Sequence, residues 1–262
     1  MKPHAFHKLL LCLYLSISTI CFAQTVPKVA LIISENPSDV SRDYHNEIDL
    51  LEDTLTQRGV QVDRHDWQNP RVNWQDYQLV LMGNIGHIDG YEEFGKWCES
   101  LSAMNVELQN SSQSLNFYLN KSNYLKKLEP FTDFAIPTHV IPKGTNKVEL
   151  ERVLSDHNWS KAVVKASVSY FGLNNFVVEK GHITTQKINQ ALEILEKSDL
   201  IVQEFMPRIK EGEISFLFFA GEFSHAVQKK PAKNEHRIHK AYGGEHQRYF
   251  PSQEEISQIK FI

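Results

Sequence analysis

Residues 201–231 read IVQEFMPRIKEGEISFLFFAGEFSHAVQKKP, and this stretch decides the fold. An apolar strand pattern leads through a proline link and an acidic turn to two further apolar strands that join near Gly221, and a polar run follows. Lys229 and Lys230 close that run, and Arg237 lies shortly after it. Strands this apolar need no cations at their ends for stability, whereas an anionic ligand such as a polyphosphate does need them. The stretch therefore predicts an anion-binding site.

The composition is that of an ordinary globular protein. The chain has 262 residues, 41% of them hydrophobic, and a formal net charge of −4. A chain of this length can hold one large domain or two modest ones. A nucleic-acid-binding protein would show a strong excess of basic residues, so the charge argues against that class.

Residues 1–23 differ from the rest of the chain. Lys2 and Lys8 precede an apolar run without acidic residues, and residues 21–23 form a small-residue cleavage site. This pattern predicts a secretory signal peptide that is too short to span a membrane comfortably, so we expect no membrane association after its removal. The alternative is a start codon assigned upstream of the true one, with the first strand beginning at Val26. The first interpretation places the protein outside the cell or in the periplasm, and the second places it in the cytoplasm.

Strand and helix patterns alternate through the first part of the chain. Residues 29–33 are apolar throughout, as expected of a strand that is buried on both faces. Amphipathic helix patterns cover 43–58 and 91–101, and further strand patterns cover 60–62 and 77–82. Such alternation predicts an α/β domain with a parallel sheet that is covered by helices.

Lys165 ends an apolar strand pattern and precedes a polar loop that contains Gly172, two serines and two asparagines. A lysine beside a flexible polar loop suits phosphate binding, because it supplies a point charge next to backbone donors. Taken alone, a surface lysine that finishes a strand explains the pattern equally well. The segments that follow favour the phosphate interpretation.

Three segments resemble the ATP-grasp superfamily, in its branch of glutathione-synthetase-like and cycloserine-biosynthesis-like ligases. Residues 221–227, Gly-Glu-Phe-Ser-His-Ala-Val, followed by Lys229, Lys230 and a proline, are the best match. Residues 120–125 resemble the family's Asn-x-x-Lys-x-Tyr-Leu segment, with altered spacing around the asparagine. Residues 136–138, Ile-Pro-Thr, resemble its Val-Pro-Thr step.

The resemblance implies an α/β fold in two parts. A small parallel-sheet domain of the pre-ATP-grasp type is expected at 24–114, and a two-lobed ATP-grasp domain at 115–262. Its first lobe would span 115–202 and its second 203–262. The family continues through a strand–helix unit whose Asp and Glu residues hold magnesium, and those positions lie beyond the end of this sequence. We therefore expect the C-terminal lobe to be incomplete.

The resemblance also implies roles for individual residues. Lys121 and Lys165 would hold phosphates of ATP, and Lys230 and Arg237 would act as catalytic residues that stabilise the transferring phosphoryl group. The link between the lobes would frame the adenine with its backbone at Gln203, Glu204, Phe205 and Met206.

A carboxylate in the acidic turn is expected to bind the ribose. By the resemblance, Glu211 or Glu213 would accept hydrogen bonds from the ribose hydroxyls. The ordinary explanation of this segment is a turn held by Gly212, and the two explanations are compatible.

The function implied is that of an ATP-dependent carboxylate–amine ligase that works through an acyl phosphate. ATP and Mg²⁺ would be its cofactors, small carboxylates and amines its substrates, and, as is common among relatives, a homo-oligomer its assembly. Two departures favour a second function, because Ala166 replaces the usual proline and no magnesium ligands are found in this sequence. The alternative is a non-catalytic nucleotide- or ligand-binding remnant, either exported or not.

Histidines near the C-terminus raise the question of a metal site. His236 and His239 are three residues apart in what the pattern indicates is a strand, so we expect them to face opposite sides. No cysteine or further ligand pattern supports zinc, and we assign no metal ligands.

Overall fold

The computed structural model describes residues 26–33, 45–83, 90–128, 130, 135–170 and 172–260. The leader expected at residues 1–23 lies outside these ranges. Within them, no helix is both long and apolar enough to cross a membrane.

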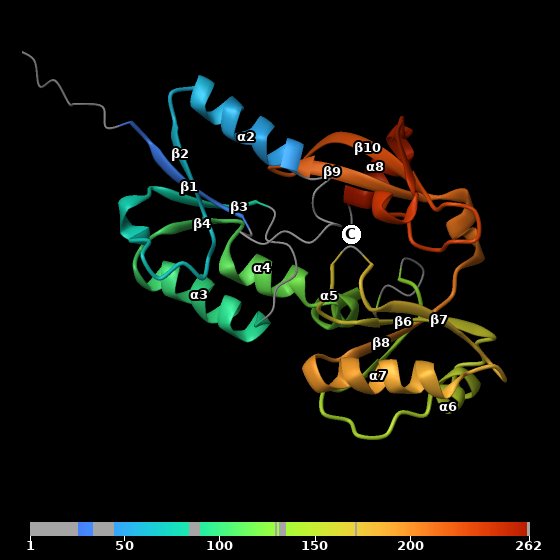
Figure 1. Ribbon diagram of the computed structural model, residues 1–262. Coiled ribbons are helices and arrows are strands. Elements are labelled where there is room, and N and C mark those ends of the chain that lie inside the picture. Colours follow the sequence, from blue (N-terminus) through green and yellow to red (C-terminus); the bar gives the residue numbers. More distant parts are fainter. Residues whose placement is uncertain are drawn as a thin grey trace, which may run out of the picture.

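The first part of the chain forms a four-stranded parallel sheet in the order β2-β1-β3-β4 (Figure 1). Parallel strands need long crossover connections, and helices supply two of them here. Figure 1 shows α2 and α3 on opposite faces of the sheet, as the alternating pattern predicted. The elements are β1 (Lys28–Ile32), α2 (His45–Gln57), β2 (Gln61–His65), η2 (Trp74–Asp76), β3 (Leu79–Met82), α3 (Tyr91–Ala103) and β4 (Glu107–Gln109).

The hydrophobic core of this part lies between the sheet and α3. Phe94, Cys98 and Leu101 recur at helical spacing on one face of α3 and are fully buried against strand residues such as Ile32. Burial of side chains of this size contributes about 1.5–3 kcal/mol each, so this face of α3 stabilises its packing against the sheet.

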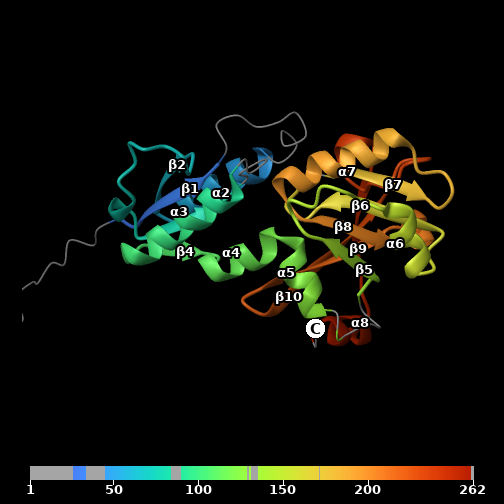
Figure 2. The ribbon, with the colours of Figure 1, turned by 90° about the horizontal axis from the view of Figure 1, so that it is seen from below.

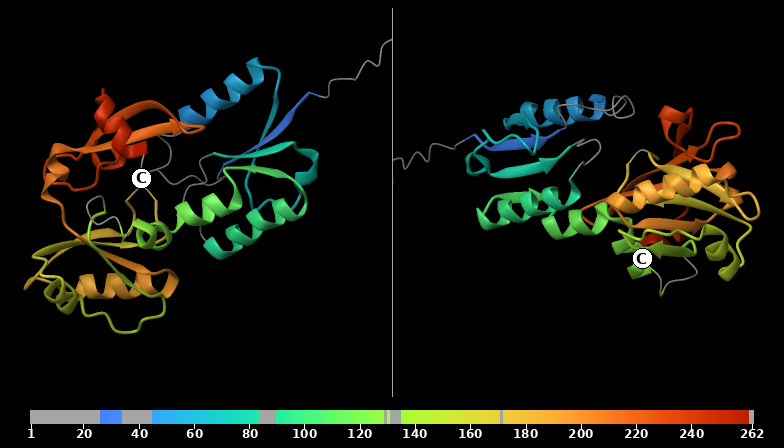
Figure 3. Two further views of the ribbon diagram at one scale, coloured as in Figure 1. Left: turned by 180° about the vertical axis from the view of Figure 1, so that it is seen from behind. Right: turned by 60° about the horizontal axis from the view of Figure 1, so that its bottom comes forward.

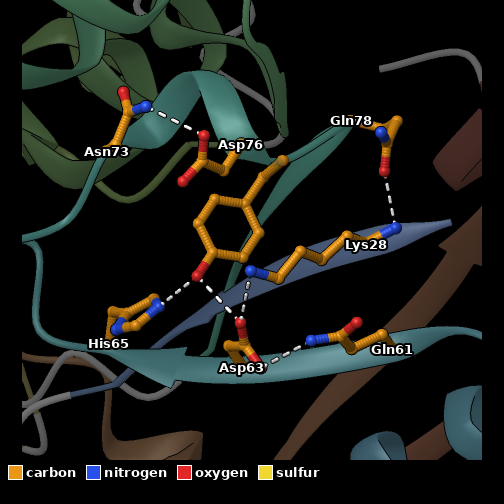
Figure 4. A network of polar contacts seen from close by, with 8 residues as sticks. Lys28, Gln61, Asp63, His65, Asn73, Asp76 and Gln78 are labelled. Carbon is orange, nitrogen blue, oxygen red and sulfur yellow. Dashed lines mark hydrogen bonds and ion pairs between the residues drawn. The ribbon is translucent and has the colours of Figure 1, made fainter.

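A polar network joins β1, β2 and the segment before β3 in the same sheet (Figure 4). The Tyr77 hydroxyl donates a hydrogen bond to Asp63 Oδ2 at 2.9 Å, and His65 Nε2 lies 2.6 Å from that hydroxyl. Lys28 Nζ lies 3.0 Å from the same carboxylate oxygen. The network ties β1, β2 and the segment before β3 together, and we assign it a structural role.

The middle of the chain forms an antiparallel sheet in the order β5-β8-β6-β7. Figure 1 shows α6 and α7 together on one face of it. In β6 the residues Ala162, Val164 and Ala166 are buried, which leaves alternate residues to point away from these helices. The elements are β5 (Thr138–Ile141), α6 (Leu150–Asp156), β6 (Lys161–Ala166), β7 (Asn175–Glu179), α7 (Thr185–Lys197) and β8 (Leu200–Glu204).

Two short helices connect the parallel sheet to this middle sheet. They are α4 (Ser112–Leu119) and α5 (Lys121–Leu128). Figures 2 and 3 show both of them between the two parts of the molecule. The Ser111 side chain caps α4 by accepting a hydrogen bond from the Ser114 amide at 3.2 Å.

The last part of the chain forms a second antiparallel sheet in the order β11-β10-β9. The predicted strand pair around Gly221 is present, and the polar run 224–230 belongs to its second strand. The α/β fold with a parallel sheet followed by two further lobes is therefore confirmed. The elements are η3 (Pro207–Glu211), β9 (Glu213–Phe219), β10 (Glu222–Lys230), η4 (Lys240–Tyr242), β11 (Glu245–Tyr249) and α8 (Gln253–Lys260).

Candidate functional site

A polar pocket of about 300 Å³ lies where the middle and C-terminal sheets face each other. It receives side chains from α5, β6, β9, β10, β11 and the segment between β10 and η4. Four cationic residues line it, and Glu213 contributes the one carboxylate among the described lining residues. The cations are Lys121, Lys165, Lys229 and Arg237. Such a surplus of positive charge in a partly buried pocket suits a polyanion.

Lys121 begins α5 and is held over the polar loop that follows β6. Its Nζ donates hydrogen bonds to the Ser169 carbonyl at 2.6 Å and to the Ser169 hydroxyl at 3.2 Å. Burial, helped by the neighbouring charge of Lys165, lowers the pKa of Lys121 to about 8. In the described part of the chain no carboxylate forms an ion pair with this ammonium group, so its charge is not neutralised there.

Lys165 extends from β6 on the side away from the covering helices. Its Nζ donates a hydrogen bond to Gln203 Oε1 at 2.9 Å, and Gln203 Nε2 donates to Thr138 Oγ1 at 2.9 Å. Burial lowers the pKa of Lys165, and Glu213 opposes that shift. Gln203, expected at the adenine through its backbone, thus orients the ammonium group of Lys165 with its side chain.

The lysine that β10 contributes is Lys229, and Lys230 does not line the pocket. Successive side chains of a strand point to opposite faces. In the strand register, Lys229 lies opposite Glu213 of β9 and opposite His246 of β11, and both of these residues also line the pocket. Lys230 is exposed on the other face, where its Cγ lies close to Gly212. The geometry therefore favours Lys229 over Lys230 for contact with an anion bound there.

Arg237 lines the pocket and is held by two neighbours. Its Nη2 lies 2.6 Å from Glu235 Oε2, and its guanidinium stacks 3.5 Å from the centre of the Tyr242 ring. The hydrogen bond from Arg237 holds the pKa of Glu235 at about 2, so this carboxylate stays ionised. Nε of Arg237 is buried and has no hydrogen-bond partner among the described groups.

The prediction that His236 and His239 face opposite sides is wrong. Residues 231–239 form no strand, because β10 ends at Lys230, so strand alternation does not apply to them. Both imidazoles line the pocket together with His246. His236 Nε2 lies 3.0 Å from Asn175 Oδ1 of β7, which links the two lobes across the pocket. Over the described ranges, no cluster of three or more His, Cys, Asp or Glu side chains could hold a metal ion.

The link between the lobes lies beside the pocket without lining it. The amides of Glu204 and Phe205 donate hydrogen bonds to the carbonyls of Pro137 and Lys161, each at 3.0 Å. Met206 follows them and is exposed. The adenine-binding role expected of this link therefore remains a prediction.

Of the two acidic residues proposed for the ribose, Glu213 lines the pocket and Glu211 does not. Glu211 ends η3, where its carboxylate lies 3.4 Å from Arg208 Nε. Gly212 adopts a φ of +111°, which favours glycine, so the expected turn is present between the two carboxylates.

Two known protein families match parts of this chain. Residues 126–259 match the prokaryotic glutathione synthetase ATP-grasp domain, and residues 29–110 match the N-terminal domain of the D-cycloserine synthetase DcsG. The chain belongs to the ATP-grasp family. Direct comparison with curated protein sequences gives no match.

Solved structures of other ATP-grasp proteins share the fold. The crystal structure of D-cycloserine synthetase DcsG matches with a TM-score of 0.73 and 20% identity over 89% of this chain and 78% of that one. D-alanine–D-alanine ligase from Bacillus anthracis in complex with ATP matches with a TM-score of 0.61 and 14% identity over 89% and 74% of the two chains. D-alanyl-alanine synthetase A from Vibrio cholerae O1 biovar eltor str. N16961 matches with a TM-score of 0.61 and 11% identity over 90% and 79%.

The lowered pKa of Lys121 predicts a pH dependence of stability. The folded protein releases this proton near pH 8, whereas an unfolded lysine keeps it to about pH 10.5. Burial of the charged lysine therefore lowers the free energy of unfolding by its full amount below pH 8. This destabilisation decreases by about 1.4 kcal/mol per pH unit as the pH rises from 8 to 10.5. We expect urea unfolding between pH 7 and 10 to show that Lys121→Met is most stabilised, relative to the wild type, at pH 7. A difference that stays constant with pH would contradict the assigned shift.

Proposed function

We propose that this protein is an ATP-dependent ligase that joins a carboxylate to an amine through an acyl phosphate. The observation that carries the proposal is the convergence of Lys121, Lys165, Lys229 and Arg237 on one pocket with a single carboxylate in its described lining. The negative charge of the ATP triphosphate would balance the excess of positive charge in this pocket. Membership of the ATP-grasp family supports ATP as the ligand.

The chemistry has two steps. A carboxylate oxygen of the first substrate attacks the terminal phosphorus of ATP, and ADP leaves with the electrons of the broken P–O bond. The nitrogen of the second substrate then attacks the acyl carbon, phosphate leaves, and the nitrogen loses a proton as the C–N bond forms. Both steps build negative charge on phosphoryl oxygens, and cations that are fixed in advance stabilise that charge.

The residues of the pocket divide this task between them. Lys121 is held by its hydrogen bond to Ser169 and Lys165 by its hydrogen bond to Gln203, so each ammonium group is positioned before a ligand binds. Arg237 presents a planar guanidinium that can grip a phosphoryl group with two hydrogen bonds, and its stacking on Tyr242 fixes that plane.

The described residues of the pocket provide no ready site for the magnesium that the family implies. Glu213 and Glu235 are the carboxylates nearest the pocket, and Glu235 is already paired with Arg237. No set of three ligands comes together in the described residues, so we assign no step to a metal.

One observation favours the alternative of a non-catalytic nucleotide-binding protein. Tyr170, in the loop that follows β6, packs against the core of the parallel sheet, and its hydroxyl is buried without a partner among the described groups. A loop that is anchored in this way has less freedom to close over a nucleotide.

Calorimetric titration of the full chain with ATP, with and without Mg²⁺, tests the proposal. We expect ATP to bind, and ADP to be released when a carboxylic acid panel and hydroxylamine are added. Binding without any ADP release would support the alternative. The absence of binding at millimolar ATP would overturn the ligase and would leave, of the alternative, only a protein that binds another ligand.

The neighbouring lysines of β10 provide a matched pair of variants. We expect Lys229→Gln to weaken ATP binding by about tenfold, because a hydrogen bond to a charged group contributes about 1.5–3 kcal/mol. Lys230→Gln removes the same charge from the opposite face and should leave the affinity within about twofold, since surface charges interact weakly. Calorimetry on both variants measures the difference. The reverse order of effects would restore Lys230 as the phosphate ligand.

A further inference from the structure

A second hollow of about 530 Å³ lies beside the phosphate pocket on the C-terminal sheet. His246 lines both spaces, so the two are neighbours. Beyond the row of Lys229 and His246, the hollow is lined by His225 and Val227 of β10 and by Arg248 of β11. The residues already assigned to ATP do not line it.

The register of the strands places these side chains on the face that carries Lys229. Val227 lies opposite Arg248, and Lys229 lies opposite His246, in the antiparallel pair β10–β11. Residues directly opposite each other, and residues two apart along a strand, share a face. One step of two residues along a strand covers about 7 Å. Arg248 therefore lies about one such step beyond the row of Lys229 and His246.

The hollow is cationic. Arg248 forms no ion pair with any described carboxylate, and its guanidinium lies 4.9 Å from the exposed Phe250 ring. The Nδ1 atom of His225 lies 3.0 Å from the Ser224 hydroxyl, at hydrogen-bond distance. His246 Nε2 donates to the Ile238 carbonyl at 3.0 Å, since a carbonyl can only accept. No acidic residue is among the described residues that line the hollow.

We propose that the hollow binds a second anionic group of the carboxylate substrate, which makes that substrate a short dicarboxylic acid. This inference rests on the proposed ligase function. One carboxylate would lie at the phosphate pocket, where it meets the terminal phosphate of ATP. The other carboxylate lies about one strand step away, where Arg248 grips it with two hydrogen bonds and His225 supplies a further donor. A monocarboxylic acid of equal length leaves Arg248 unpaired.

The test compares glutarate with pentanoate, which have equal carbon chains and differ in one carboxylate. Each is titrated calorimetrically into the full chain, first without nucleotide and then with a saturating non-hydrolysable ATP analogue. The variants are Arg248→Gln and His225→Gln. Arg152→Gln is the matched control, because Arg152 is exposed on α6 and pairs only with Glu149 in the described structure. Titration of ATP into every variant runs in parallel.

We expect glutarate to bind at least tenfold more tightly than pentanoate, and Arg248→Gln to abolish that preference while ATP affinity stays unchanged. The control Arg152→Gln should keep the preference. Equal affinities for the two acids in the wild type, or a preference that survives in both Arg248→Gln and His225→Gln, would overturn the inference. If the wild type failed to bind ATP, the proposed function would be overturned instead, whichever affinities are measured for glutarate and pentanoate.

Discussion

Replacement of Lys165 by methionine is expected to lower the affinity for ATP by about 10- to 100-fold. The ammonium group lies deep in the pocket, and its charge is balanced there by no ion pair within the described residues. A hydrogen bond to a charged group contributes about 1.5–3 kcal/mol, and each 1.4 kcal/mol is a factor of ten in affinity. Methionine keeps the length of the apolar stem, so the change removes the charge and little else.

Stability should move in the opposite direction in the same variant. Burial lowers the pKa of Lys165, which means that the charged form of this side chain destabilises the folded protein at neutral pH. Lys165→Met relieves that cost and is expected to unfold at the wild-type temperature or above it. Gln203, which accepts the lysine hydrogen bond, loses a partner but keeps Thr138.

Lys180→Met serves as the control for this variant, because Lys180 is exposed just beyond the far end of β7. Calorimetry measures ATP binding, and a thermal melt measures stability in the same samples. Unchanged ATP affinity in Lys165→Met would remove Lys165 from the site. A weaker affinity together with a lower melting temperature would point to disturbed folding and not to the loss of a phosphate ligand.

The elements of the fold followed from local patterns. The helix pattern at 43–58 corresponds to α2 (His45–Gln57), and Gly59 after it adopts a φ of +80°, as expected of a residue that ends a helix. The apolar run 29–33 became β1 at the centre of the parallel sheet, with partners on both sides. These patterns are local, so the sequence alone is enough to predict them.

The contribution of β10 to the site was harder to predict. The register of β10 against β9 shifts between Phe223 and His225, and such an irregularity exchanges the faces to which later side chains point. Which of two adjacent lysines faces the pocket depends on that shift, and nothing in the run 221–230 signals it. The same limit explains Gln203, whose contact with Lys165 joins residues 38 positions apart.

The histidines show a different limit. The pattern around His236 and His239 was interpreted as a strand, in which the two side chains would face opposite sides. The chain leaves the sheet at Lys230, before Pro231, which cannot donate a ladder hydrogen bond. That proline was the signal that could have placed both histidines in a loop and therefore on the same pocket.

Replacement of Gly244 by alanine is expected to damage the pocket from a distance. A Cβ added at this position would lie 2.2 Å from the Ile238 carbonyl oxygen and 2.6 Å from its carbon. These are backbone atoms and cannot rotate away, so the turn that joins 238–239 to β11 must open. The Gly244 amide also donates to the His239 carbonyl at 3.1 Å. We expect the free energy of unfolding to fall by about 1–3 kcal/mol, as for other substitutions that overpack a site.

The same opening should weaken ATP binding by at least tenfold, because Arg237 and His239 line the pocket from this segment. Gly144→Ala is the matched control. Gly144 has a φ of +81° and no atom within 4 Å of an added Cβ, so alanine there pays about 1 kcal/mol of backbone strain without any overlap. A chemical melt and an ATP titration on both variants separate the two effects. If Gly244→Ala bound ATP as the wild type does while losing stability, Arg237 would not depend on this turn, and its pairing with Glu235 and Tyr242 alone would suffice to place it.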